Sequence, residues 1–283
     1  MDAQWKNQKG KRAGKKEVVP LYTMADVEAA LKYLVPCEYH QNISLCQGVE
    51  LKFIDAGHLL GSASIELKLS EEAVSKKLIF SGDIGNIDQP IINDPQYFKS
   101  ADYVVMESTY GDRNHEPSKD YTLDLAEIID KTLVSGGNVI IPSFAVGRTQ
   151  ELLYFIRDIK ERRLVKSMPH FPVYVDSPLA IEATRVFAEN LKVYGDGPAL
   201  ELIKKGTDPL TFKNLHMSQT SEESKQLNFD ETPKVIIASS GMCEAGRIRH
   251  HLKHNLWRRE CKIVFVGYQA NGTLGRLLLD GAK

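Results

Sequence analysis

The chain has 283 residues, of which 42% are hydrophobic and 26% charged, and its formal net charge is −1. Such a chain can bury one large core or two moderate ones, which argues against a disordered protein or a wholly basic nucleic-acid binder. No apolar run approaches the roughly 18 residues of a membrane span, and the polar, basic start lacks the apolar stretch of a secretory signal. We therefore expect a cytoplasmic protein without a membrane partner.

The beginning of the chain is locally basic, although the chain as a whole is not. We interpret residues 1–20 as a solvated arm or linker, with a nucleic-acid contact as the alternative. The basic residues of this arm are Lys6, Lys9, Lys11, Arg12, Lys15 and Lys16. The four cysteines have no C-x-x-C spacing, which argues against a disulfide scaffold or a zinc ribbon.

The pattern up to about residue 110 predicts one helix followed by strands. Residues 23–34 carry apolar side chains at helical spacing, and Thr23 can cap the helix. Alternating or continuous short apolar runs then predict strands at residues 49–53, 64–69, 77–81 and 101–106. The last of these runs ends at an acidic residue, Glu107.

Beyond residue 120 the pattern alternates between strand and helix. Apolar runs predict strands at residues 138–143, 173–176, 234–238 and 262–267. Amphipathic stretches predict helices at residues 121–134, 149–163, 181–190, 246–256 and 273–279. Residues 194–232 are interpreted as an excursion of helix and loop. This alternation indicates an α/β fold in which helices cover both faces of a parallel sheet.

Two short segments carry the residues best suited to chemistry. The first is Asp-Ala-Gly-His-Leu-Leu-Gly-Ser-Ala at residues 55–63, and the second is Ser-Gly-Asp-Ile-Gly at residues 81–85. Each segment follows a predicted strand, where loops on a rigid sheet commonly hold ligands. His58 offers an imidazole nitrogen to a metal, and the two oxygens of Asp83 can bridge two cations.

Together with later motifs, these segments resemble the β-CASP branch of the metallo-β-lactamase superfamily. This branch includes RNA-processing nucleases such as the cleavage and polyadenylation endonuclease subunit and its prokaryotic relatives. The later matches are Met-Glu-Ser-Thr-Tyr-Gly-Asp at 106–112, Pro-Ser-Phe-Ala-Val-Gly-Arg-Thr-Gln-Glu at 142–151, Val-Asp-Ser-Pro-Leu-Ala at 175–180, Ser-Ser-Gly-Met-Cys-Glu-Ala-Gly-Arg at 239–247 and Gly-Tyr-Gln-Ala-Asn-Gly-Thr-Leu-Gly at 267–275.

The resemblance implies a partial metallo-β-lactamase αββα domain at residues 21–120 and a doubly wound, parallel-sheet β-CASP domain at residues 121–283. It further implies zinc-dependent hydrolysis of RNA phosphodiester bonds at a site that holds two zinc ions in the complete family. His58 would be a ligand of one zinc ion, and Asp83 would bridge both. Glu107 would orient a catalytic histidine without binding metal.

The β-CASP motifs have a physical interpretation of their own. Two of them pass from a strand through small residues into a helix, which turns backbone N–H groups and the positive helix end toward an anion. We expect single-stranded RNA phosphates to contact this surface, and a homodimer is left open. The residues expected to bind phosphate are Ser143, Arg148, Ser240, Gly241 and Arg247.

Among the remaining histidines, only His254, one helical turn from His250, could in principle pair with another histidine at a metal. His250 and His251 are adjacent on a predicted helix, so their side chains diverge by about 100° and do not share one metal readily. We interpret both as packing or RNA-facing residues. His40, His115, His170 and His216 are expected in surface loops or turns.

The sequence also departs from the family pattern. It has no His-x-His-x-Asp-His cluster and no Ser-Ala-His-Ala-Asp-like segment. A catalytic zinc ion needs at least three protein ligands, so we expect a truncated chain that binds zinc weakly and cleaves RNA poorly alone. The alternatives are a catalytically inactive RNA-binding or scaffold subunit and, more distantly, a nucleotide-binding α/β enzyme. The last lacks both G-x-G-x-x-G and G-x-x-x-x-G-K-[ST].

Overall fold

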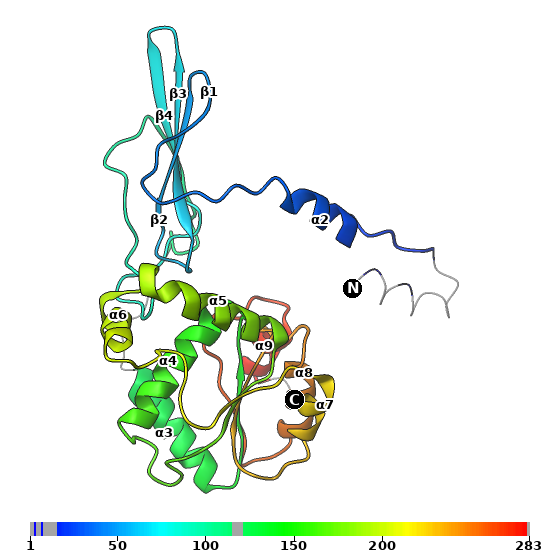
Figure 1. Cartoon of the computed structure of the whole chain (residues 1–283). Coiled ribbons are helices and arrows are strands. Elements are labelled where there is room, and N and C mark those ends of the chain that lie inside the picture. Colours follow the sequence, from blue (N-terminus) through cyan, green and yellow to red (C-terminus); the bar gives the residue numbers. More distant parts are fainter. Residues whose placement is uncertain (1–2, 4–6, 8–15, 115–120, 282–283) are drawn as a thin grey trace. The chain divides into compact units, whose positions relative to one another are not determined.

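The computed structural model describes residues 3, 7, 16–114 and 121–281 (Figure 1). The arm residues Lys6, Lys9, Lys11, Arg12 and Lys15, and also His115, lie outside the described residues. The chain separates into two units, Met1–Gln41 and Asn42–Lys283, and each is considered by itself. The domain boundaries expected near residues 20 and 120 stay predictions.

The first unit contains the helix predicted after the basic arm, α2 (Met24–Leu31). Thr23 caps it, since the backbone N–H of Asp26 donates to Thr23 Oγ1 while Asp26 accepts from the Thr23 backbone N–H at 2.7 Å. This reciprocal capping box offsets the missing hydrogen bonds of the first turn. None of the helix residues is buried, so local capping rather than packing defines the helix.

The second unit begins with a five-stranded sheet in the order β1-β2-β3-β4-β5. Its strands are β1 (Ile43–Cys46), β2 (Val49–Asp55), β3 (Ala63–Glu71), β4 (Val74–Phe80) and β5 (Tyr103–Val105). Strands β1 to β4 pair in antiparallel fashion, whereas β5 runs parallel to β4. Strands β2, β4 and β5 therefore run in one direction, and their carboxyl ends lie at the same edge of the sheet.

The same unit continues with a second five-stranded sheet in the order β10-β6-β9-β7-β8, in which every pair is parallel. The strands are β6 (Val139–Pro142), β7 (Val173–Val175), β8 (Leu215–Met217), β9 (Val235–Ala238) and β10 (Lys262–Ile263). The helices are α3 (Tyr121–Val134), α4 (Arg148–Glu161), α5 (Pro178–Tyr194), α6 (Gly197–Lys204), α7 (Ser221–Gln226), α8 (Ile248–Asn255) and α9 (Leu274–Leu279).

Two apolar cores lie on the two faces of the parallel sheet. Successive strand residues point to opposite faces, so Val139 and Ile141 pack into one core while Ile140 packs into the other. The first core includes side chains of α3, α4 and α5, and the second includes Ile248 and Leu252 of α8. Figure 1 shows α3 and α4 on one side of these strands and α7 and α8 on the other. The predicted parallel sheet with helices on both faces is confirmed.

The sequence did not predict two of the strands, β1 and β8. Strand β1 is largely exposed, and its pairing with β2 is interrupted by a register shift between Ser44 and Cys46. Strand β8 has three residues, with the exposed His216 at its centre, in the stretch interpreted as helix and loop. Both are edge strands, whose short and partly polar sequences carry little periodicity.

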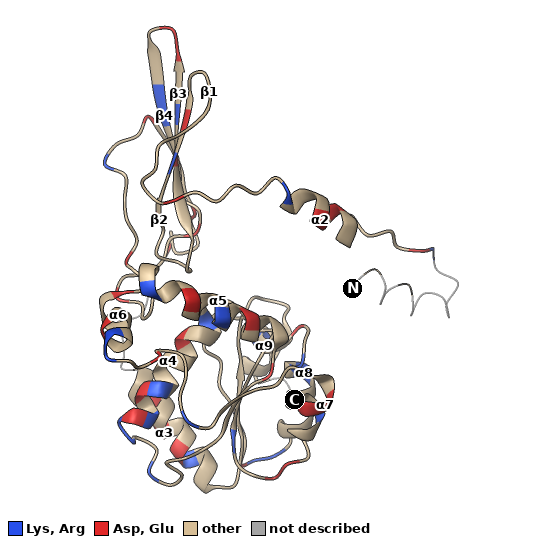
Figure 2. Ribbon diagram, in the orientation of Figure 1, with Lys and Arg blue, Asp and Glu red and all other residues tan. Residues whose placement is uncertain are grey.

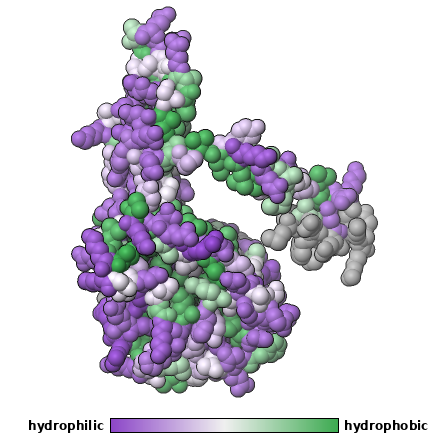
Figure 3. Space-filling view, in the orientation of Figure 1, coloured by the Kyte–Doolittle hydropathy of each residue, from purple (hydrophilic) through white to green (hydrophobic). Residues whose placement is uncertain are grey.

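The surfaces of the two sheets differ. The helices around the parallel sheet present both acidic and basic residues to solvent (Figure 2). On the first sheet, β5 and the next residue are exposed, with Tyr103, Val104, Val105 and Met106 each at least 57% accessible. Figure 3 shows apolar surface along the strands of this sheet.

Candidate metal and phosphate sites

The two segments with metal-binding side chains form one backbone-packed structure. The loop after β2 holds His58, and the loop after β4 holds Asp83. The backbone N–H of Gly85 donates to Ala56 O at 2.8 Å, which joins the two loops directly. A Cβ on Gly85 would lie 1.6 Å from the carbonyl oxygen of Gly57, so this approach requires glycine.

The loop that carries His58 is shaped by short-range hydrogen bonds. Gly57 has a φ of +62° and donates its backbone N–H to Asp55 Oδ1 at 2.8 Å. The hydroxyl of Ser62 accepts from the backbone N–H groups of His58 and Leu59, both at 3.1 Å. These bonds hold the loop backbone while the imidazole of His58 faces solvent.

Glu107, immediately beyond Met106 and the end of β5, ties a third segment to the same edge. Its carboxylate accepts from the backbone N–H of Ile84 at 2.6 Å, and its own backbone N–H donates to Ser81 Oγ at 3.0 Å. The Thr109 side chain, the Ile84 N–H and the charge of His58 together lower the pKa of Glu107 below its ordinary value of 4.5. An ionised carboxylate therefore lies beside the Asp83 loop.

The described residues do not by themselves complete a metal centre. His58 and Asp83 are both exposed at the joined loops. Across residues 16–114 and 121–281, however, no group of three or more His, Cys, Asp or Glu side chains could hold a metal ion. Two ligands fall short of the three protein ligands that a catalytic zinc ion requires.

At the parallel sheet, the expected phosphate-binding residues follow β6 and β9. Ser143 is buried, and its hydroxyl donates to Phe144 O at 3.2 Å and accepts from Thr149 Oγ1 at 3.0 Å. A Cβ on Gly241 would lie 3.1 Å from the backbone nitrogen of Phe144, so the two strand-to-helix loops lie against each other. Ser240 is half-buried and accepts from the backbone N–H of Ala245 at 3.2 Å.

The two arginines expected at this edge have different surroundings. Arg148 begins α4, pairs with Glu151 on the same helix, and keeps 38% of its side chain exposed. Arg247 lies just before α8, keeps 20% exposed, and pairs with Asp176 at 2.7 Å. Its guanidinium also donates to the carbonyl oxygens of Ser218 at 3.0 Å and Gln219 at 2.8 Å. Three of its five N–H donors are thus bonded within the protein.

The structure shows a polar cluster that the sequence did not reveal. Asp176, at the end of β7, is fully buried and receives hydrogen bonds from Arg247, His251 and Ser224. His250, the neighbour of His251, is exposed. The sequence signals for Asp176 were its place directly after a buried strand and the family motif at residues 175–180. Neither could pair it with partners 48 to 75 positions away.

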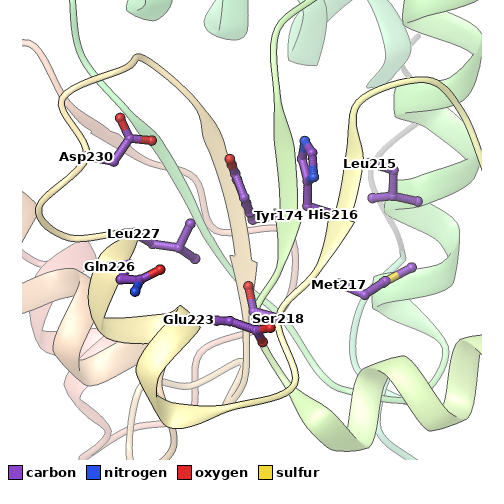
Figure 4. Close-up of a pocket in the computed structure, with 9 residues that line it drawn as sticks. All are labelled: Tyr174, Leu215, His216, Met217, Ser218, Glu223, Gln226, Leu227 and Asp230. Atoms are coloured by element: carbon purple, nitrogen blue, oxygen red, sulfur yellow. The ribbon is translucent and has the colours of Figure 1, made fainter.

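A groove of about 530 Å³ lies between β8 and α7 (Figure 4). The rings of Tyr174 and His216 stack within it, with centroids 4.7 Å apart and planes inclined by 20°. Glu223 and Asp230 add carboxylates to its lining. The groove could not be predicted from the sequence, because β8, which forms one wall, was not predicted.

Comparison with known proteins agrees with this architecture. A Beta-Casp domain matches residues 149–278. The chain is 38% identical over 256 residues to Ribonuclease TTHA0252 of Thermus thermophilus, which covers 90% of this chain and 57% of that protein. It is 31% identical to an RNase J-like protein of Methanocaldococcus jannaschii (93% and 59%) and 30% identical to transcription termination factor FttA of Methanosarcina mazei (93% and 41%).

The chain is thus similar to RNA nucleases of the β-CASP branch of the metallo-β-lactamase superfamily. A largely antiparallel sheet followed by a parallel sheet fits a metallo-β-lactamase-type domain followed by a β-CASP domain, and the Beta-Casp match includes β7 to β10 of the parallel sheet. The chain spans less than three fifths of the length of these relatives. Within the described residues, no helix is long and apolar enough to cross a membrane.

Proposed function

We propose that this protein takes part in metal-dependent hydrolysis of RNA phosphodiester bonds, as an RNA-processing nuclease in the cytoplasm. The observation that carries the proposal is the meeting of three motif segments at one sheet edge, where Gly85 bonds to Ala56 and Glu107 bonds to Ile84. The names of the relatives, which include a ribonuclease and an endoribonuclease, support the same class of reaction. The comparisons give no support to a homodimer.

Zinc is the cofactor that we propose, with His58 and Asp83 as two of its ligands and Glu107 as a neighbouring carboxylate. The support for zinc is the family resemblance, which implies two ions, together with the exposed imidazole and carboxylate at the joined loops. Because two ligands do not satisfy a catalytic zinc ion, we propose that this chain alone binds zinc weakly and cleaves RNA poorly.

The RNA backbone is proposed to bind at the carboxyl edge of the parallel sheet, where Arg148 is the most exposed cation of the motif residues. An arginine at this edge would make charge-assisted hydrogen bonds to the phosphate oxygens of RNA. Arg247 has at most two N–H donors left for phosphate after its internal bonds. The small residues of the two loops offer their backbone and hydroxyl groups. The proposed residues are Ser143, Arg148, Ser240, Gly241 and Arg247.

RNA binding is tested with a fluorescent oligouridylate titrated with the purified chain over a range of salt concentrations. We expect Arg148→Ala to weaken binding and to reduce the salt slope by about one, because one phosphate contact is lost. Arg162→Ala is the matched control, since Arg162 lies exposed at the other end of α4 and pairs with Asp158. Equal affinities of wild type and Arg148→Ala would overturn this assignment.

Metal and catalysis are tested by zinc calorimetry and by cleavage of the same RNA with and without a chelator. We expect weak zinc binding that weakens further in His58→Ala and is unchanged in His216→Ala, an exposed histidine of β8. Tight, stoichiometric zinc binding together with robust RNA cleavage would contradict the proposed weak zinc binding and poor cleavage. If the protein bound RNA without cleaving it, the alternative of a catalytically inactive RNA-binding subunit would be favoured. The absence of a group of three metal ligands among the described residues agrees with that alternative.

A further inference from the structure

A fully buried carboxylate joins three elements of the parallel-sheet domain. Asp176 follows β7, and its Oδ1 accepts from Arg247 at 2.7 Å. Its Oδ2 accepts from His251 Nε2 and from Ser224 Oγ, both at 2.6 Å. Arg247 and His251 lie one turn apart at the start of α8, so their side chains reach Asp176 from the same helix face. Ser224 approaches from α7.

The orientation of His251 is set on both sides of its ring. Nδ1 faces Asn228 Oδ1 at 3.0 Å, and the amide nitrogen of Asn228 donates to Ser224 O at 3.2 Å. This second bond fixes which end of the Asn228 amide faces the imidazole. Both ring nitrogens of His251 therefore face acceptor oxygens, and the ring bridges Asp176 to the α7 segment.

A carboxylate without solvent needs such partners, since an unpaired buried charge is strongly destabilising. Burial alone would raise the pKa of Asp176, but hydrogen bonds from His251, Ser224 and Arg247 outweigh it and lower the pKa below 3.8. Asp176 is thus ionised at neutral pH. Glu223 adds a second negative charge near Arg247, and its pKa is lowered first by hydrogen bonds from the backbone N–H groups of Thr220 and Gln219 and last by the charge of Arg247.

Arg247 lies at the end of the loop after β9, so its bond to Asp176 also restrains that loop. Its guanidinium also binds the carbonyl oxygens of Ser218 and Gln219, which follow β8. The residue after it, Ile248, donates its backbone N–H to Ser239 O at 3.2 Å, at the end of β9. The side chain of Arg247 therefore connects the ends of β7 and β8, and the backbone of the next residue connects them to the end of β9.

We propose that Asp176 and His251 are positioning residues, which hold Arg247 and the 239–247 loop in the arrangement that contacts RNA phosphate. This inference rests on the proposed function. Neither residue touches RNA: Asp176 and His251 are both inaccessible to solvent, and each acts through Arg247. Conversely, a purely structural ion pair would contribute to folding but leave the RNA affinity of the folded chain unchanged.

The test compares Asp176→Asn and His251→Gln with two controls. One is His170→Gln, at an exposed histidine of the loop before β7, and the other is Ser224→Ala, which removes one Asp176 contact without touching Arg247. Oligouridylate affinity is measured against salt at a temperature where circular dichroism shows each variant folded. We expect Asp176→Asn and His251→Gln to lose about five- to tenfold in affinity and about one unit of salt slope. His170→Gln should bind as wild type does, and Ser224→Ala should keep the wild-type salt slope.

A double-mutant cycle supplies the readout that distinguishes positioning from folding. Asp176→Asn added to Arg247→Ala should cause no further loss of RNA affinity if Asp176 acts through Arg247. Additive losses, or variants that are less heat-stable but bind RNA with wild-type affinity and slope, would overturn the inference. Should Asp176→Asn fail to fold, the same cycle is run with His251→Gln.

A second measurement separates this inference from the proposed function. The Nη–H resonances of Arg247, whose protons make its internal hydrogen bonds, report the order of its guanidinium in the absence of RNA. We expect a resolved, slowly exchanging signal in wild type that broadens in Asp176→Asn. If wild type binds no RNA, the proposed function fails, and an unchanged Arg247 signal in Asp176→Asn would overturn the positioning role as well.

Discussion

Glu107 accepts a hydrogen bond from the backbone N–H of Ile84 at 2.6 Å, across 23 positions of sequence. The bond links the end of β5 to the loop that carries Asp83. That loop in turn donates from Gly85 to Ala56, beside His58. The position of the Asp83 loop therefore depends on Glu107, which belongs to a different motif, at residues 106–112.

Replacing Glu107 tests how far this carboxylate holds the loop. We expect Glu107→Gln to lower the free energy of unfolding by about 1–2 kcal/mol at neutral pH, because a charge-assisted hydrogen bond becomes a neutral one. The folded pKa of Glu107 lies below 4.5, so its contribution is present above pH 4.5 and is lost as the pH falls through the folded pKa. Urea unfolding at several pH values measures both effects, with Glu71→Gln, exposed at the end of β3, as the control. A difference that persists in acid would contradict the explanation.

The contact between the two loops predicts a strong effect of one added methyl group. Gly85→Ala places a Cβ 1.6 Å from Gly57 O, so the loops must separate. We expect a loss of about 1–3 kcal/mol in unfolding free energy. We also expect faster hydrogen exchange of the residue 85 amide, because its bond to Ala56 O at 2.8 Å is broken. Gly267→Ala is the matched control, since a Cβ at Gly267 meets nothing within 4 Å. Equal stability and exchange in Gly85→Ala and wild type would show that the loops can shift freely.

Lys160 predicts a stability change in the alkaline range. Its amine donates to Phe171 O at 2.6 Å and lies 3.7 Å from the centre of the Phe171 ring, and burial lowers its pKa from 10.5 to about 8. The folded state therefore holds fewer protons than the unfolded state between these values, and folding gains stability as the pH rises.

The unfolding free energy of wild type relative to Lys160→Met should therefore increase between pH 8 and pH 10.5. The increase is at most about 3 kcal/mol, since one pKa unit corresponds to about 1.4 kcal/mol. Chemical denaturation at the two pH values measures it. The same comparison with the exposed Lys192→Met should show no such trend. A difference between wild type and Lys160→Met that does not change with pH would exclude a lowered pKa.

Asn138 predicts a large effect on the parallel sheet. Its buried side chain donates to Asn255 Oδ1 at 2.9 Å and accepts from the backbone N–H of Lys234 at 3.2 Å, which joins β6, β9 and α8. Asn138→Ala leaves buried polar groups without their bonds, so we expect a loss of about 2–4 kcal/mol. Thermal unfolding measures it, with Asn190→Ala, whose bond to Val186 O is exposed, as the control. Losses of equal size in the two variants would contradict the role of burial.

The sequence by itself determined the order of elements and the chemistry of the motif loops. The continuous apolar runs at β6 and β9 predicted buried parallel strands, because both faces of such strands meet side chains of packed helices. The positions of His58 and Asp83 at strand ends also followed from local pattern. The short edge strands β1 and β8 escaped prediction, since strands of three or four residues carry little periodicity.

Only the tertiary structure decided which polar groups meet. Arg247 and Asp176 are 71 positions apart, and His251 and Asp176 are 75 apart, so no local spacing could pair them. The parallel topology brings the ends of β7 and β9 to one edge, and burial then requires each charge to find a partner there. The local sequence determines periodicity and turns. The loss of solvent that forces buried polar groups to pair acts only on groups that the folded sheet brings together.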